Sequence, residues 1–119
     1  MESTPCAIVI FNKNREIVLA NAMSEQMFGY ASQELLGQSV DILFPPRFRY
    51  IFAEIIRNST EVPYVPESEN YHGLRKNGNE LPVEIDLSLI SIAEEKLMLA
   101  SIVDLTERKK NGTGNQQTA

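Results

Sequence analysis

The residues of this chain that could do chemistry are few, and they form no recognisable catalytic or metal-binding set. Glu84 and Asp86 are carboxylates at alternate positions, and such a pair does acid–base work only in a pocket that shifts its pKa values. His72 has no second metal-type residue at useful spacing. Cys6, the single cysteine, can form no internal disulfide and no cysteine-based metal site alone. Without a nucleophile–base pair or a glycine-rich phosphate loop, we expect no enzymatic activity.

Composition and charge narrow the class of protein further. The chain has 119 residues, the size of one domain, and is 43% hydrophobic and 23% charged, as in ordinary globular proteins. A formal net charge of −5 argues against binding to nucleic acid or an anionic membrane. No apolar run is long enough to cross a bilayer, and residues 1–5 do not begin a signal peptide. We therefore expect a cytoplasmic location.

The first half of the chain predicts a hairpin followed by helices. Apolar runs at residues 7–11 and 16–20 flank a polar, asparagine-containing turn, the pattern of two paired strands. Asn21 can cap a helix that extends to Phe28, and Ser32 can cap a second short helix that Gly37 ends. After Pro45 a longer helix to about residue 58 has one apolar face.

The second half predicts three strands. Residues 71–76 form the first, and the Asn77-Gly78 turn leads into alternating apolar and polar residues over 81–89. A turn at 93–96 precedes the last strand, at 97–104. The sequence therefore predicts an α+β fold, a five-stranded antiparallel sheet covered on one face by short helices and one longer helix. Residues 1–6 form a flank, 7–110 the domain and 111–119 a disordered tail.

Five motifs in this order resemble the PAS family of sensory domains over roughly residues 7–110. They are Ala20-Asn21-Ala22 leading into Phe28-Gly29-Tyr30; Glu34-Leu35-Leu36-Gly37-Gln38; Phe44-Pro45-Pro46; Arg75-Lys76-Asn77-Gly78 with Leu81-Pro82-Val83-Glu84-Ile85; and Asp104-Leu105-Thr106-Glu107-Arg108. The resemblance implies a sheet cupped by helices and a sensory role within a larger signalling protein.

The resemblance also allows the family's cofactors to be tested residue by residue. The flavin-binding light sensors carry a reactive cysteine where this chain has Val40, which excludes a cysteinyl-flavin adduct. The haem-binding members place a histidine on the long helix, and residues 47–58 contain none. Phe48 or Tyr50 takes the matching position, and tyrosine ligates haem in other folds. Non-covalent flavin, a small organic ligand and no ligand all stay open.

The resemblance singles out three groups of residues. Asp104 and Thr106 resemble the family's output motif, which couples the sheet to the segment that follows; the simpler interpretation is a strand-end cap. Glu34 and Lys76 match a surface salt bridge, or are two solvated charges. If a cavity exists, its expected wall is Val40, Phe48, Phe52, Ile55, Ile56, Leu87 and Leu99.

Two functions follow from these observations. The first is a sensory and signal-relay module that senses a small molecule or transmits a signal through dimer contacts and the Asp104-Leu105-Thr106 exit. Its partners would be a second copy in a homodimer and an output domain, such as a two-component sensor histidine kinase or a cyclic-nucleotide enzyme, with no nucleic acid and no membrane contact. The second is a ligand-free interaction or dimerisation module.

Overall fold

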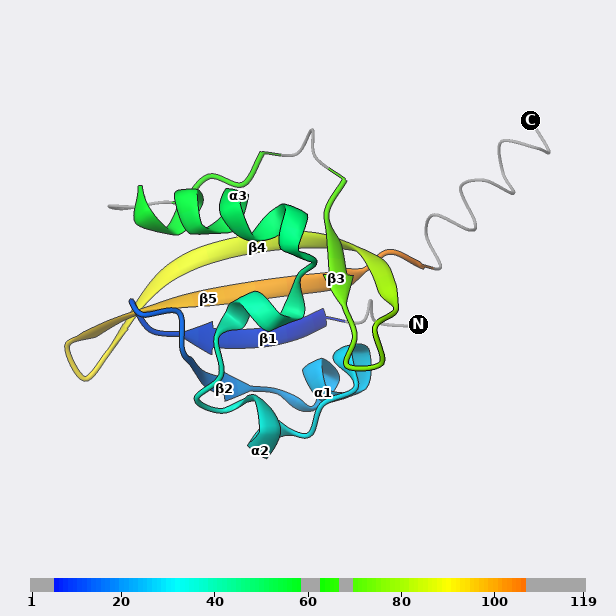
Figure 1. Cartoon of the computed structure of the whole chain (residues 1–119). Helices are drawn as coiled ribbons and strands as arrows, with labels where there is room; N and C mark the ends of the chain where they lie inside the picture. The colour runs from blue at the N-terminus through cyan, green and yellow to red at the C-terminus, as the bar shows by residue number, and fades with distance from the viewer. Residues whose placement is uncertain (1–5, 59–62, 67–69, 107–119) are drawn as a thin grey trace, which may run out of the picture.

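The computed structural model describes residues 6–58, 63–66 and 70–106 of the chain. Its elements follow in chain order: β1 Cys6–Phe11, β2 Ile17–Ala20, α1 Ala22–Phe28, α2 Ser32–Leu35, the 3₁₀ helix η1 Val40–Leu43, α3 Pro46–Arg57, β3 His72–Leu74, β4 Glu80–Ile92 and β5 Glu95–Asp104. Five antiparallel strands form one sheet in the order β2-β1-β5-β4-β3. The helices lie over one face of this sheet (Figure 1), so the predicted fold is confirmed.

Strand alternation places the core between the sheet and the helices. In β1 the buried core side chains are Ala7, Val9 and Phe11, at every second position. In β4 and β5 the same face carries two further sets of core side chains: Leu81, Val83 and Ile85, and Met98, Ala100 and Ile102. Because successive strand residues point to opposite faces, the residues between them form an outer face without helices.

One predicted cavity residue lies on the wrong face for that role. Leu99 is half-buried between Met98 and Ala100, and both of those neighbours belong to the core. It pairs with Ser88, whereas Leu87 pairs with Ala100. Leu99 therefore points to the outer face, and its assignment to the cavity wall was wrong because adjacent strand residues cannot share a face.

Local sequence signals account for the helices. The Asn21 side chain caps α1 by accepting a hydrogen bond from the Ser24 N–H at 2.9 Å, as predicted. Its Oδ1 also accepts from the Ile8 N–H at 3.0 Å, which ties α1 to β1. Helix α1 ends at Gly29, in the left-handed conformation at φ 82°. Pro46 occupies the first turn of α3, where its missing N–H costs no hydrogen bond.

Several boundaries differ from the prediction, including the β4–β5 turn, which spans only Ala93 and Glu94 and not 93–96, and one helix was not predicted. Residue 31, not Ser32, is the N-cap of α2. The apolar segment after Ser39 forms the 3₁₀ helix η1, because the Ser39 hydroxyl accepts from the Asp41 N–H and turns the chain. Strand β3 is limited to His72–Leu74. The expected tail at 111–119, and the expected end of the domain at 110, fall outside the described residues.

Candidate functional site

The predicted cavity wall contributes to an aromatic cluster over the sheet. Phe48 and Phe52 are 7% and 5% exposed, and their ring centroids lie 6.5 Å apart. The ring centroid of Tyr71 lies 5.7 Å from that of Phe48 and 5.2 Å from that of Phe52. The ring centroids of Phe44 and Phe52 are 4.5 Å apart. Val40 is buried as well, while Ile55, Ile56 and Leu87 are partly buried against the same core. These four rings pack against one another between the first half of α3 and the sheet.

The residues at the expected haem position do not fit that cofactor. Phe48 is buried but has no atom that can ligate iron. Tyr50, the neighbouring candidate, is 73% exposed on α3 and points away from the core. His72 stacks near the Phe48 ring at 6.2 Å, and its Nδ1 lies 3.3 Å from the Asn70 carbonyl oxygen. Over the described ranges, no three His, Cys, Asp or Glu side chains gather as metal ligands.

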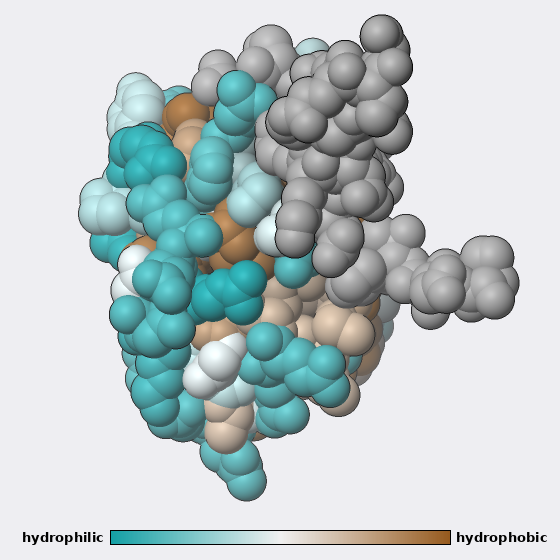
Figure 2. Space-filling view, turned by 90° about the vertical axis from the view of Figure 1, so that its right-hand side faces the viewer, coloured by the Kyte–Doolittle hydropathy of each residue, from teal (hydrophilic) through white to brown (hydrophobic). Residues whose placement is uncertain are grey.

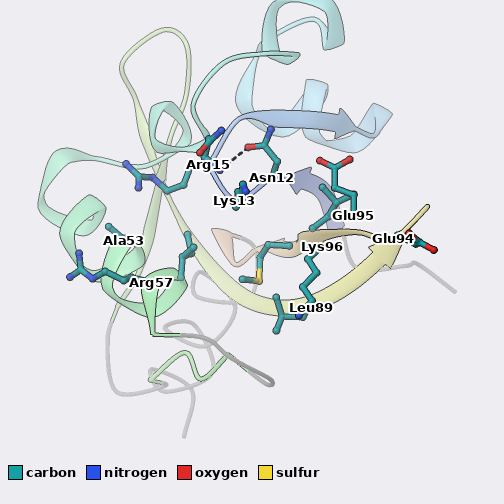
Figure 3. A pocket seen from close by; sticks show the side chains of 13 residues that line it. Asn12, Lys13, Arg15, Ala53, Arg57, Leu89, Glu94, Glu95 and Lys96 are labelled. Carbon is teal, nitrogen blue, oxygen red and sulfur yellow. Dashed lines mark hydrogen bonds between the residues drawn. The ribbon is translucent and has the colours of Figure 1, made fainter.

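A pocket of about 1070 Å³ opens at the other end of α3. Figure 3 shows it between the β1–β2 turn, the last turns of α3 and the β4–β5 hairpin. Its apolar lining is Ala53, Ile56, Leu89, Leu97 and Met98. Its polar lining is Asn12, Lys13, Asn14, Arg15, Arg57, Glu94, Glu95 and Lys96. Of the predicted wall residues, Ile56 lines this pocket.

Both arginines of the pocket have an anionic neighbour. Arg15 Nη2 lies 3.2 Å from Asp41 Oδ2, and the Arg15 side chain is 38% exposed. Arg57 pairs with Glu54 one helical turn away, and the hydrogen bond from its guanidinium lowers the pKa of the Glu54 carboxyl. The Nε of Arg15 is buried and has no acceptor within the described part of the chain. Because this Nε is inaccessible, a molecule in the pocket could reach only the exposed part of the Arg15 side chain.

Backbone strain gathers at the same end of the molecule. Arg15, Ala93 and Glu94 have φ values of 65°, 52° and 66°, in the left-handed region that side chains with a Cβ rarely adopt. Arg15 and Glu94 line the pocket, and Ala93 adjoins Glu94 in the two-residue loop between β4 and β5. A turn with two positive φ angles normally carries Asn-Gly. Each departure costs about 1–2 kcal/mol, and such strain is common at functional sites.

The expected exit motif lies where β5 ends. Asp104 Oδ1 accepts a hydrogen bond from the Thr106 N–H at 2.9 Å, and the Leu105 N–H donates to the Pro82 carbonyl at 2.9 Å. These two bonds hold Leu105 and Thr106 at the end of the sheet. Figure 2 views this side of the molecule and shows hydrophobic surface between hydrophilic side chains.

Glu34 and Lys76 lie together, with Nζ 2.5 Å from Oε2, both about half exposed. The hydrogen bond from Lys76, followed by one from the Ala31 N–H, lowers the pKa of the Glu34 carboxyl. Lys76 also donates its backbone N–H to the Phe28 carbonyl at 2.8 Å. The β3–β4 turn is thereby fastened to the α1–α2 segment.

Residue spacing provides no signal for two other links between distant segments. Arg47 donates to both Glu80 oxygens, at 2.9 and 2.7 Å, which joins the start of α3 to β4 and lowers the pKa of Glu80. Arg75 Nη1 donates to the Met27 carbonyl at 3.1 Å, at the end of α1. The partners of these arginines are 33 and 48 residues away, so spacing could not reveal them.

Of the candidate chemical groups, His72 adjoins Phe48 of the aromatic cluster, whereas Glu84, Asp86 and Cys6 belong neither to that cluster nor to the pocket lining. Glu84 and Asp86 are exposed on the outer face of β4. Cys6 is half-buried in β1 and pairs with Val103. Two carboxylates on an open sheet face lack the enclosure that acid–base catalysis needs.

The outer face of the sheet is apolar along its centre. Ile8 and Ile10 of β1 and Leu99 of β5 lie on it, with Ile10 paired to Leu99 in β5 and to Leu19 in β2. Leu19 is 46% exposed. At the β4–β5 end, Leu97 pairs with Ile90. We call Ile8, Ile10, Leu19, Ile90, Leu97 and Leu99 the outer apolar row.

Among the described residues, no helix combines the length and the apolar character needed to cross a membrane.

Comparison with known proteins agrees with this geometry. The oxygen sensor protein DosP of Escherichia coli is 27% identical over 106 residues, which are 87% of this chain and 13% of DosP. The sensor protein FixL of Bradyrhizobium diazoefficiens is 23% identical over 113 residues, 92% of this chain and 22% of FixL. This chain therefore spans less than a quarter of these relatives.

Solved structures show the same fold. The PAS domain of an HTR-like protein from Haloarcula marismortui superposes with a TM-score of 0.68 at 23% identity, covering 87% of this chain and 89% of that one. The blue-light activated histidine kinase EL346 of Erythrobacter litoralis superposes with a TM-score of 0.69 at 21% identity, covering 87% of this chain and 34% of that one. The PAS domain family matches residues 5–107. The chain belongs to the PAS domain family.

Proposed function

We propose that this chain is a cytoplasmic sensory and signal-relay module of a larger signalling protein, such as a sensor histidine kinase, and that it acts as a homodimer. Family membership supports the sensory role, and two relatives are named as sensors. The blue-light activated histidine kinase among the structural neighbours supports an output domain of that kind.

The observation that carries this proposal is the outer apolar row. Accessible apolar side chains on a sheet face without helices form a surface that a second apolar surface can cover. In the outer apolar row Leu19 is exposed and Ile8, Ile90 and Leu99 are partly exposed, whereas Ile10 and Leu97 are already buried. Leu19 is 46% exposed, and Leu99 lies on the same face in the neighbouring part of the sheet. A second copy of the chain presents an identical row, and self-complementary contact is the usual basis of a twofold dimer.

Strand β5 connects this row to the interior and to the exit. Its inner side chains Met98, Ala100 and Ile102 belong to the core, and Leu99 belongs to the outer row. Its last residue, Asp104, holds the Thr106 N–H. A shift of β5 caused by a change in the core would therefore reach the dimer contact and the exit together.

Analytical ultracentrifugation of the full chain tests the proposal. We expect the wild-type chain to form a dimer and Leu99→Glu to form a folded monomer, because a charge in an apolar contact loses its hydration. Tyr50→Glu is the control, since Tyr50 is 73% exposed on the helical side of the molecule, and we expect it to remain a dimer. A monomeric wild type, or a Leu99→Glu variant that is folded and still dimeric, would overturn the dimer.

A ligand-free interaction module is the second candidate, and the aromatic cluster favours it. Phe44, Phe48, Phe52 and Tyr71 pack against one another in the region of the expected cavity wall. Native mass spectrometry with an ultraviolet–visible spectrum of one sample separates the candidates. Excess mass or a visible band, as from a non-covalent flavin or small organic ligand, supports sensing. The sequence mass without colour supports the ligand-free module.

A further inference from the structure

The pocket at the β4–β5 end is distinct from the aromatic cluster. Helix α3 contributes Phe48 and Phe52 to the cluster, and its last turns contribute Ala53, Ile56 and Arg57 to the pocket. Leu89 and Met98 pair across β4 and β5 on the inner face and continue the apolar lining. Around these apolar residues stand eight polar or charged ones, so the pocket can contact both the apolar and the polar part of a small molecule.

Charge is unevenly distributed around this floor. The lining contains Lys13, Arg15, Arg57 and Lys96 but only two carboxylates, Glu94 and Glu95, although the whole chain carries a net charge of −5. In Figure 3, Arg15 and Arg57 lie on one side of the pocket, and Glu94 and Glu95 lie on the other. Arg15 is paired with Asp41 and Arg57 with Glu54, so the positive charge of the arginine side is largely balanced, and what the two guanidiniums offer there is the donors on their exposed parts.

A further observation concerns the backbone at the two edges of the pocket. The strained φ angles of Arg15 and Glu94 occur at opposite edges of the pocket. Strain of this kind persists where the surrounding structure fixes the backbone, as it does at binding sites.

We propose that this pocket binds a small amphipathic monocarboxylate, with its apolar body on Ala53, Ile56, Leu89 and Met98 and its carboxylate on the Arg15 and Arg57 side. A guanidinium presents planar paired donors that match a carboxylate. The ligand should carry a single negative charge, because Glu94 and Glu95 lie across the pocket from the arginines and would repel further negative charge. The inference rests on the sensory part of the proposed function and is independent of the dimer.

Decanoate serves as the probe, with decanol as its uncharged counterpart. In titrations of the full chain followed by amide NMR, we expect decanoate to shift the signals of Ala53, Leu89 and Met98 and to bind at least tenfold more tightly than decanol. Arg57→Gln should weaken decanoate about tenfold, as expected from losing one charge-assisted hydrogen bond, and leave decanol unchanged. Ala53→Leu should weaken both probes because it fills the floor.

Arg47→Gln is the matched control. Arg47 also lies on α3 and pairs with a glutamate, Glu80, but it does not line the pocket. Its substitution should leave decanoate binding unchanged. The inference is overturned if decanoate does not bind at millimolar concentration, if decanol binds equally well, or if Arg47→Gln and Arg57→Gln weaken decanoate alike. Sedimentation of the same samples reports the dimer separately, so either proposal can fail alone.

Discussion

Gly73→Ala should destabilise the domain by a steric mechanism. A Cβ at Gly73 would lie 2.7 Å from Phe28 Cε1 and 3.2 Å from Leu81 Cδ2, closer than side-chain carbons normally approach. Phe28 is 0% exposed and Leu81 is 1% exposed, so neither side chain can move into solvent. Overpacking of this kind costs about 1–3 kcal/mol, or a fall in the thermal midpoint of roughly 5–20 °C for a domain of this size.

Thermal unfolding followed by circular dichroism measures this cost. Phe28→Leu removes the ring edge, so we expect Gly73→Ala to cost less in that background, which gives a coupling energy in a double-mutant cycle. Gly78→Ala is the control: Gly78 has φ +94° and no atom within 4 Å of the added Cβ, so its cost comes from backbone strain alone. The reasoning is wrong if Gly73→Ala barely changes the midpoint, or costs the same with and without Phe28.

Three further changes test other parts of the structure. Glu94→Gly should increase the free energy of unfolding by up to about 1 kcal/mol and so raise the thermal midpoint, because glycine accepts φ 66° without strain. A lower midpoint would contradict this. Asp104→Ala should speed amide hydrogen exchange at Thr106 while changing the midpoint little, since it removes one exposed acceptor; a midpoint loss as large as that of a core truncation would indicate a purely structural role. The lowered pKa of Glu34 means that its pairing with Lys76 stabilises the fold at neutral pH. That contribution should disappear as the pH falls below the ordinary value of 4.5 and through the folded-state pKa, so the difference in midpoint between wild type and Glu34→Gln should vanish there.

Features set by neighbouring residues were predictable from the sequence. The alternation over 81–89, the cap at Asn21, the Asn77-Gly78 turn and the start of α3 at Pro46 all depend on a few adjacent positions. The backbone conformations that these residue types favour are local, so one sequence is enough to read them. The motifs of the PAS family are also short and local, and they were enough to predict the fold class and the sensory role.

The face of Leu99 and the partner of β1 required the tertiary structure. Strand β5 carries the apolar run Leu97-Met98-Leu99-Ala100, in which either alternation could face the core. Pairing with β4 and β1 on both sides decides the matter, and β1 lies about ninety positions earlier in the chain. The register of a strand that is apolar on both faces follows from its neighbours and not from its own pattern.

The pocket and the long-range ion pairs were also decided by the fold alone. The pocket takes its lining from the β1–β2 turn, the end of α3 and the β4–β5 hairpin, three segments that are far apart in the sequence. Arg47 and Glu80 meet only because α3 lies over β4. Sequence by itself determined which segments are strands, helices and turns, because those choices depend on local backbone preference. Which side chains share a site depended on how the segments pack, because a contact between residues far apart in the chain produces no pattern in the sequence.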